Sequence, residues 1–128
     1  MIGSASLTAG GSASLTAGAA AGVRIWLATA PLDMRRSFDA LAEHVRVILN
    51  DDPMSGHLFV FRNRSSQRLK ILWWDKDGYA IYYKRLERGT FQFPSAGEKS
   101  MAIDSGQLMK LLAGCAVGAI PGRGAQPW

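Results

Sequence analysis

Side chains able to bind nucleic acid are densest between residues 62 and 88, where basic residues alternate with aromatic rings. Lys and Arg neutralise phosphates and release condensed counterions, which supplies most sequence-independent affinity for DNA. Exposed aromatic rings can in addition stack on unpaired bases. The candidate phosphate-binding residues of this stretch are Arg62, Arg64, Arg68, Lys70, Lys84, Arg85 and Arg88.

Two rings in the same stretch, Trp74 and Tyr82, are candidates for base stacking or for docking a partner protein. The alternative is that both rings lie beneath a second layer of structure, with the lysines reaching solvent at its rim. The arginines between residues 62 and 68 sit in a polar loop and are expected to be exposed. A phosphate-binding role is therefore better supported than a stacking role.

Arg35 and Arg36 form a second candidate cluster, in the first turn of a predicted helix. They are either a phosphate clamp or surface residues whose charge is neutralised by Asp39 and Glu43 along the helix. The residue pattern leaves both interpretations open.

Residues suited to catalysis are few. His44, His57 and the single Cys115 do not have metal-ligand spacing. Two close carboxylate pairs, at residues 51–52 and 75–77, are what a metal-dependent nuclease would need, but they fit a helix-ending loop and a turn. We predict no catalytic residue, no metal and no cofactor, with a metal-dependent nuclease as the less favoured alternative.

Residues 69–86 are predicted to form a hairpin around which the domain is built. The Asp-Lys-Asp-Gly turn favours a three-residue loop with Gly78 in the left-handed region. This register pairs Trp73 with Ile81 and Ile71 with Tyr83. One face then carries the core residues Leu69, Ile71, Trp73, Ile81 and Tyr83, and the other carries Lys70, Leu72, Trp74, Ala80, Tyr82 and Lys84.

The rest of the chain supplies the other elements. We predict strands at residues 23–28, 57–62 and 90–93, a helix capped by Asp33 that ends near Asn50, and a short helix starting near Asp104 or Ser105. The predicted fold class is α+β: an antiparallel sheet of four or five strands, with one long helix packed across a face and a short C-terminal helix.

Composition sets the domain organisation and the class of partner. Residues 1–22 contain a tandem GSASLTAG repeat and are expected to be a flexible extension, residues 23–113 one domain, and residues 114–128 a loose Gly/Pro-rich tail. A net charge of +5 and a pI of about 9.8 favour a polyanionic partner. With one cysteine, no signal sequence and no membrane-length apolar run, we expect a cytoplasmic protein without membrane contact.

Residues 22–113 resemble the TnpB-type accessory protein, the second open reading frame product of the sixty-six family of bacterial insertion sequences. The motifs that carry the resemblance are Asp33, Met34, Arg35, Phe38 and Asp39; Gly56, His57, Leu58, Phe59 and Phe61; and Trp73, Trp74, Asp77, Gly78, Tyr83, Lys84, Arg85, Leu86 and Gly89. The resemblance implies a non-enzymatic accessory protein of DNA transposition. Its implied partners are DNA at the insertion-sequence ends and the transposase of the same element. The alternative is a transposase-docking module without direct DNA contact.

Overall fold

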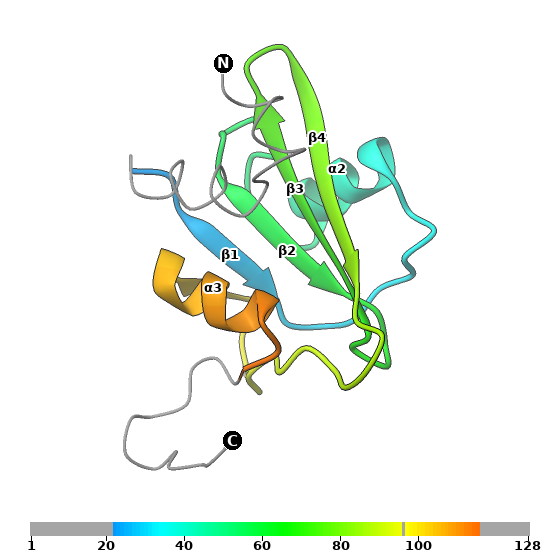
Figure 1. Cartoon of the computed structure of the whole chain (residues 1–128). Helices are drawn as coiled ribbons and strands as arrows, with labels where there is room; N and C mark the ends of the chain where they lie inside the picture. Colours follow the sequence, from blue (N-terminus) through cyan, green and yellow to red (C-terminus); the bar gives the residue numbers. More distant parts are fainter. Residues whose placement is uncertain (1–21, 96, 116–128) are drawn as a thin grey trace.

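The computed structural model describes residues 22–95 and 97–115, so most of the predicted extension and tail lie outside the described residues. Five strands and two helices follow one another along this part of the chain (Figure 1). They are β1 (Ile25–Ala28), α2 (Phe38–Val47), β2 (Leu58–Arg62), β3 (Arg68–Asp75), β4 (Gly78–Arg85), β5 (Ser100–Ile103) and α3 (Ser105–Leu112).

The five strands form one mixed sheet in the order β4-β3-β2-β1-β5. Strand β1 runs parallel to β2 and antiparallel to β5, and β3 pairs antiparallel with both of its neighbours. The prediction of an antiparallel sheet was therefore wrong. The chain returns from β1 to β2 through a long crossover that contains α2, and such a connection joins parallel strands.

The prediction of one long helix across a face was also wrong, because α2 spans only Phe38–Val47. Asp33 does not cap it. The Asp33 side chain instead accepts a hydrogen bond from the Arg35 backbone, and the first helical bond runs from the Leu41 N–H to the Ser37 carbonyl. Residues 33–36 thus form a separate turn ahead of the helix.

Helices α2 and α3 lie on opposite sides of the sheet (Figure 1). Leu41, Ala42 and Val45 of α2 pack in one buried cluster with Phe59 and Phe61 of β2. The other cluster lies on the opposite face of the sheet, where Leu58 and Val60 of β2 pack with the three buried leucines of α3, Leu108, Leu111 and Leu112. Both faces of the central strands are therefore buried.

The β3–β4 hairpin has a register one residue away from the predicted one. Asp75 pairs with Gly78 across a two-residue loop, and Lys76, not Gly78, takes the left-handed conformation with φ 61°. A shift of one residue moves every side chain of the second strand to the opposite face. Tyr82 therefore lies on the α3 side of the sheet and Tyr83 on the α2 side.

Two further differences concern the end of the domain. The predicted strand at residues 90–93 is absent; Phe91 is buried in irregular structure, and its N–H donates to the Ser66 carbonyl. The fifth strand is instead β5, in a stretch predicted as loop. Helix α3 begins where predicted, with Asp104 and Gln107 in a reciprocal capping box that satisfies two helix-end donors.

Neither helix in the described part of the chain is long and apolar enough to cross a bilayer.

Candidate nucleic-acid interface

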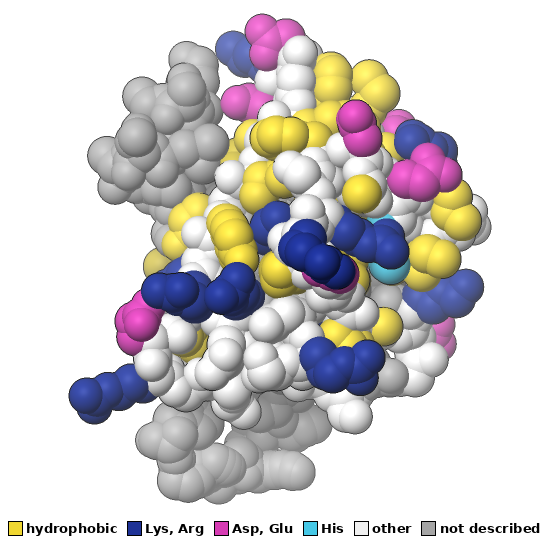
Figure 2. Space-filling view, turned by 90° about the vertical axis from the view of Figure 1, so that its right-hand side faces the viewer, with side chains coloured by type: hydrophobic (Ala, Val, Ile, Leu, Met, Phe, Trp, Pro, Cys, Tyr) yellow, Lys and Arg dark blue, Asp and Glu magenta, His cyan; other side chains and the backbone are white. Residues whose placement is uncertain are grey.

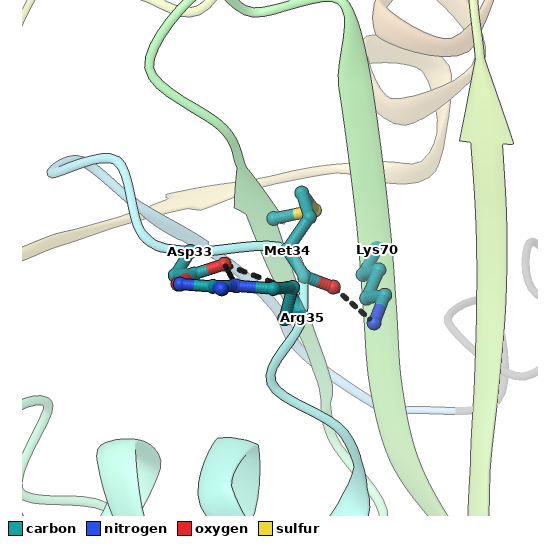
Figure 3. A network of polar contacts seen from close by, with 4 residues as sticks. All are labelled: Asp33, Met34, Arg35 and Lys70. Carbon is teal, nitrogen blue, oxygen red and sulfur yellow. Dashed lines mark hydrogen bonds and ion pairs between the residues drawn. The ribbon is translucent and has the colours of Figure 1, made fainter.

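Lys70 joins β3 to the turn at residues 33–36. Its side chain is only 6% exposed, and its ammonium donates to the carbonyls of Met34 and Arg36, both at 2.7 Å (the Met34 bond is drawn in Figure 3). Two backbone acceptors thus compensate the cost of burying this charge. In a longer α2 these carbonyls would accept from backbone N–H groups four residues on, so their bonds to Lys70 compete with an earlier start of the helix. The lysine positions the segment that carries Arg35 and Arg36.

Arg68 and Arg85 lie directly opposite each other on β3 and β4. Like charges in this arrangement repel and destabilise a sheet. Arg68 donates to the hydroxyl of Tyr83 at 3.2 Å, and Arg85 pairs with Glu87. Both arginines line one hollow at the β4 edge of the sheet.

Two adjoining hollows meet at Arg68. The larger, about 730 Å³, is lined by residues of the 31–35 and 63–68 segments, including Arg35 and Arg64. The smaller, about 340 Å³, is lined by Arg68, Tyr83, Arg85 and Glu87. We call this surface the arginine groove and define it by Arg35, Arg64, Arg68 and Arg85. Figure 2 shows Lys and Arg side chains gathered in a band across this side of the molecule.

Two arginines of the groove are held by exposed carboxylates. Arg35, whose side chain is 91% exposed, pairs with Asp33 at 2.7 Å, and Arg85 pairs with Glu87 at 3.0 Å. The hydrogen bonds from the Arg35 side chain and then its backbone lower the pKa of Asp33 to about 2, so this carboxylate is ionised at neutral pH. Exposed ion pairs of this kind contribute little free energy and exchange easily for another anion.

The remaining predicted phosphate-binding residues divide into two groups. Arg62 donates to the Thr29 carbonyl and the Ser66 hydroxyl, with burial lowering its pKa, and Lys84 donates to the Leu112 carbonyl at the end of α3. The side chains of Arg62 and Lys84 therefore make hydrogen bonds within the domain. Arg36, Arg64 and Arg88 are exposed, and none forms an ion pair within the described residues.

The aromatic candidates lie away from the groove. Tyr82 packs against the α3-side cluster, and Trp74 is half-buried with its ring edge-on to Tyr79 at a centroid distance of 4.9 Å. The ring that borders the groove is Tyr83, which the sequence analysis assigned to the core. Tyr82 and Tyr83 are neighbours in β4, so the residue pattern of this strand is compatible with either ring facing the groove. Only the pairing register between β3 and β4 decides which of the two does.

Groups needed for hydrolysis do not gather in the described residues. No cluster of three or more His, Cys, Asp or Glu side chains there is arranged to hold a metal ion. His57 accepts a hydrogen bond from the Arg24 backbone through Nδ1. His44 stacks edge-on against Phe61, and burial, followed by the charge of Arg36, lowers its pKa. Both imidazoles thus have local roles in the fold.

Fold and surface together define a small domain with a five-stranded mixed sheet and two short helices, whose notable surface feature is a cluster of arginines. The family model described as IS66 Orf2 like protein matches residues 23–120, and the chain belongs to this family. The family consists of accessory proteins associated with transposition of insertion sequences.

Two curated proteins of Sinorhizobium fredii (strain NBRC 101917 / NGR234) are similar to the chain. Uncharacterized protein y4hO is 47% identical over 92 residues, which cover 72% of this chain and 80% of that protein. Uncharacterized protein y4jC is 37% identical over 93 residues, covering 73% and 80% respectively. No solved structure matches the chain.

Proposed function

We propose that the protein is a non-enzymatic accessory protein of transposition that binds the DNA backbone through the arginine groove. The observation that supports the proposal is the Arg68–Arg85 cross-strand pair. Both arginines line the smaller hollow, and Arg68 also lines the larger one, together with Arg35 and Arg64. Arg36 and Arg88, which are exposed and form no ion pair within the described residues, are further candidate phosphate contacts.

Charge repulsion supplies the physical argument. Two guanidinium groups held opposite each other destabilise the free protein, and a phosphate between them removes that cost while adding charge-assisted hydrogen bonds. The partner carboxylates Asp33 and Glu87 are exposed and weakly held, so phosphate oxygens can replace them. An anionic polymer therefore fits this surface better than a neutral ligand.

The salt dependence of binding tests the proposal. The logarithm of the affinity of the full chain for a duplex from an insertion-sequence end should fall linearly with the logarithm of salt concentration. With each of the four groove arginines contacting one phosphate, the slope should be roughly −4. Binding that is absent at low salt, or independent of salt, would contradict the proposal.

The alternative function is docking of the transposase without DNA contact. It is favoured by the exposed apolar side chains of Phe38, Val47 and Ile48 along α2 and its end. Apolar docking is far less sensitive to salt than phosphate binding. A complex with transposase that survives moderate salt, together with no DNA binding by the protein alone, would favour this alternative.

Replacing the carboxylate that holds Arg85 is expected to strengthen DNA binding. Glu87→Gln frees the guanidinium and should raise affinity about threefold, within the range that an exposed ion pair can supply. Fluorescence anisotropy at low salt measures the change. Glu43→Gln removes the same charge and a similar ion pair with Arg46 on α2, and so serves as the matched control. An equal gain in both variants would mean that net charge alone, not release of Arg85, is responsible.

A further inference from the structure

Tyr83 is the aromatic ring of the arginine groove. It is 47% exposed, lies on the edge strand β4, and faces the same side of the sheet as Arg68 and Arg85. Together these three residues and Glu87 line the hollow of about 340 Å³. An exposed ring between two cations is the arrangement that a nucleotide needs, since its base is flat and apolar and its phosphate is charged.

Contacts on two sides fix the orientation of the ring. The Lys70 ammonium lies 4.8 Å from the ring centroid, and the hydroxyl accepts a hydrogen bond from Arg68 at 3.2 Å. Lys70 is itself held by two backbone carbonyls, so the support beneath the ring is rigid. A ring oriented before the ligand arrives loses little side-chain entropy on stacking.

We propose that Tyr83 stacks on an unpaired base of single-stranded DNA while Arg68 and Arg85 bind the flanking phosphates. This inference rests on the proposed function and specifies its substrate class. Bases within a duplex are stacked on each other and do not offer a free face, so the ring adds affinity only where the strand is unpaired. The sheet edge then prefers single strands over duplex.

Anisotropy measurements with the full chain and three labelled probes test the inference. The probes are a single strand, its duplex, and the same strand with the central bases removed to leave abasic sugars. At one salt concentration, the wild type should bind the intact single strand about tenfold more tightly than the abasic strand. Tyr83→Leu should remove most of that difference, with a smaller loss on the duplex and abasic probes because Arg68 loses its hydrogen bond to the Tyr83 hydroxyl. Tyr83→Phe loses the same hydrogen bond but keeps the ring, and should retain most of the difference.

The outcomes separate the two proposals. Equal binding of intact and abasic strands by the wild type, or equal losses on all three probes in Tyr83→Leu, would overturn the stacking role and leave backbone binding in place. Absence of binding to every probe at low salt would overturn both proposals. Thermal unfolding of Tyr83→Leu and Tyr83→Phe shows whether each variant is folded, and the ring-retaining variant gives a second reading if the leucine variant is not.

Discussion

Replacing Arg68 and Arg85 together by alanine is expected to weaken DNA binding about 100-fold at low salt. In the proposed complex each guanidinium makes charge-assisted hydrogen bonds to phosphate, and such a bond is worth about 1.5 kcal/mol or more, close to a factor of ten each. The same substitution removes a repulsive cross-strand pair, but also the Arg68–Tyr83 hydrogen bond and the exposed Arg85–Glu87 ion pair. These small effects oppose each other, so the free energy of unfolding should stay within about 1 kcal/mol of the wild-type value. Weaker binding together with nearly unchanged stability is a result that general damage to the fold cannot produce.

A variant with the same change in net charge provides the control. Arg24, which precedes β1, and Arg46, in the last turn of α2, lie outside the arginine groove, and their double alanine variant should lose much less affinity. The slope of log affinity against log salt should become less steep by about 2 in the groove variant, one for each lost phosphate contact. Equal losses in the two double variants would mean that net charge, not the groove, attracts DNA.

Sequence reasoning located most elements but misjudged how they pair. The hairpin strands and the start of the short helix near Asp104 carry local signals, and both are found close to the predicted positions. Strand β5 has only four residues, with Ile103 as its single buried position, so its alternation was too short to recognise. The parallel pairing of β1 with β2 follows from the crossover through α2, whereas the apolar pattern alone predicts a helix added to an antiparallel sheet.

The length of α2 could not be read from the apolar spacing alone. Met34 continues the stripe of Leu41 and Val45 and is buried, as a helical residue would be. It reaches the core from a turn, because the Lys70 ammonium binds the Met34 carbonyl from a strand 36 residues away. A contact of that separation leaves no local trace in the sequence.

The candidate site shows the same limit. Counting cations identified the stretch that carries Arg64, Arg68 and Arg85, but it could not tell them from Lys70 and Lys84, whose ammonium groups are used by backbone carbonyls. Because the hairpin register differs by one residue from the predicted one, Tyr83 and not Tyr82 lies on the face of the sheet that carries Arg68 and Arg85. Side chains at neighbouring positions of β4 are similar enough that the pattern alone fits both registers.

Lys70→Met is expected to destabilise the domain by about 2–4 kcal/mol. The variant keeps the length and apolar character of the lysine stem, but it leaves the carbonyls of Met34 and Arg36 without their donor in a largely buried position. Loss of the positive charge also relieves repulsion with Arg68 and removes the favourable contact with the Tyr83 ring, two opposing effects of about 1 kcal/mol or less each. Urea denaturation gives the free energy of unfolding. Amide hydrogen exchange at residues 33–37 should become faster as the turn loosens.

Lys84→Met is the matched control, because it makes the same chemical change on the neighbouring strand. Its ammonium donates to one carbonyl, that of Leu112 at 2.8 Å, and the side chain is only partly buried, so the cost should be about 1 kcal/mol. DNA affinity should fall more in Lys70→Met than in Lys84→Met, since only Lys70 holds the turn that presents Arg35 to the groove. Equal stability costs, or faster exchange at residues 33–37 in both variants, would show that Lys70 does not position this segment. If the two variants differ in stability as expected but have equal DNA affinities, the turn does not contribute to DNA binding. The interface would then consist of Arg64, Arg68 and Arg85.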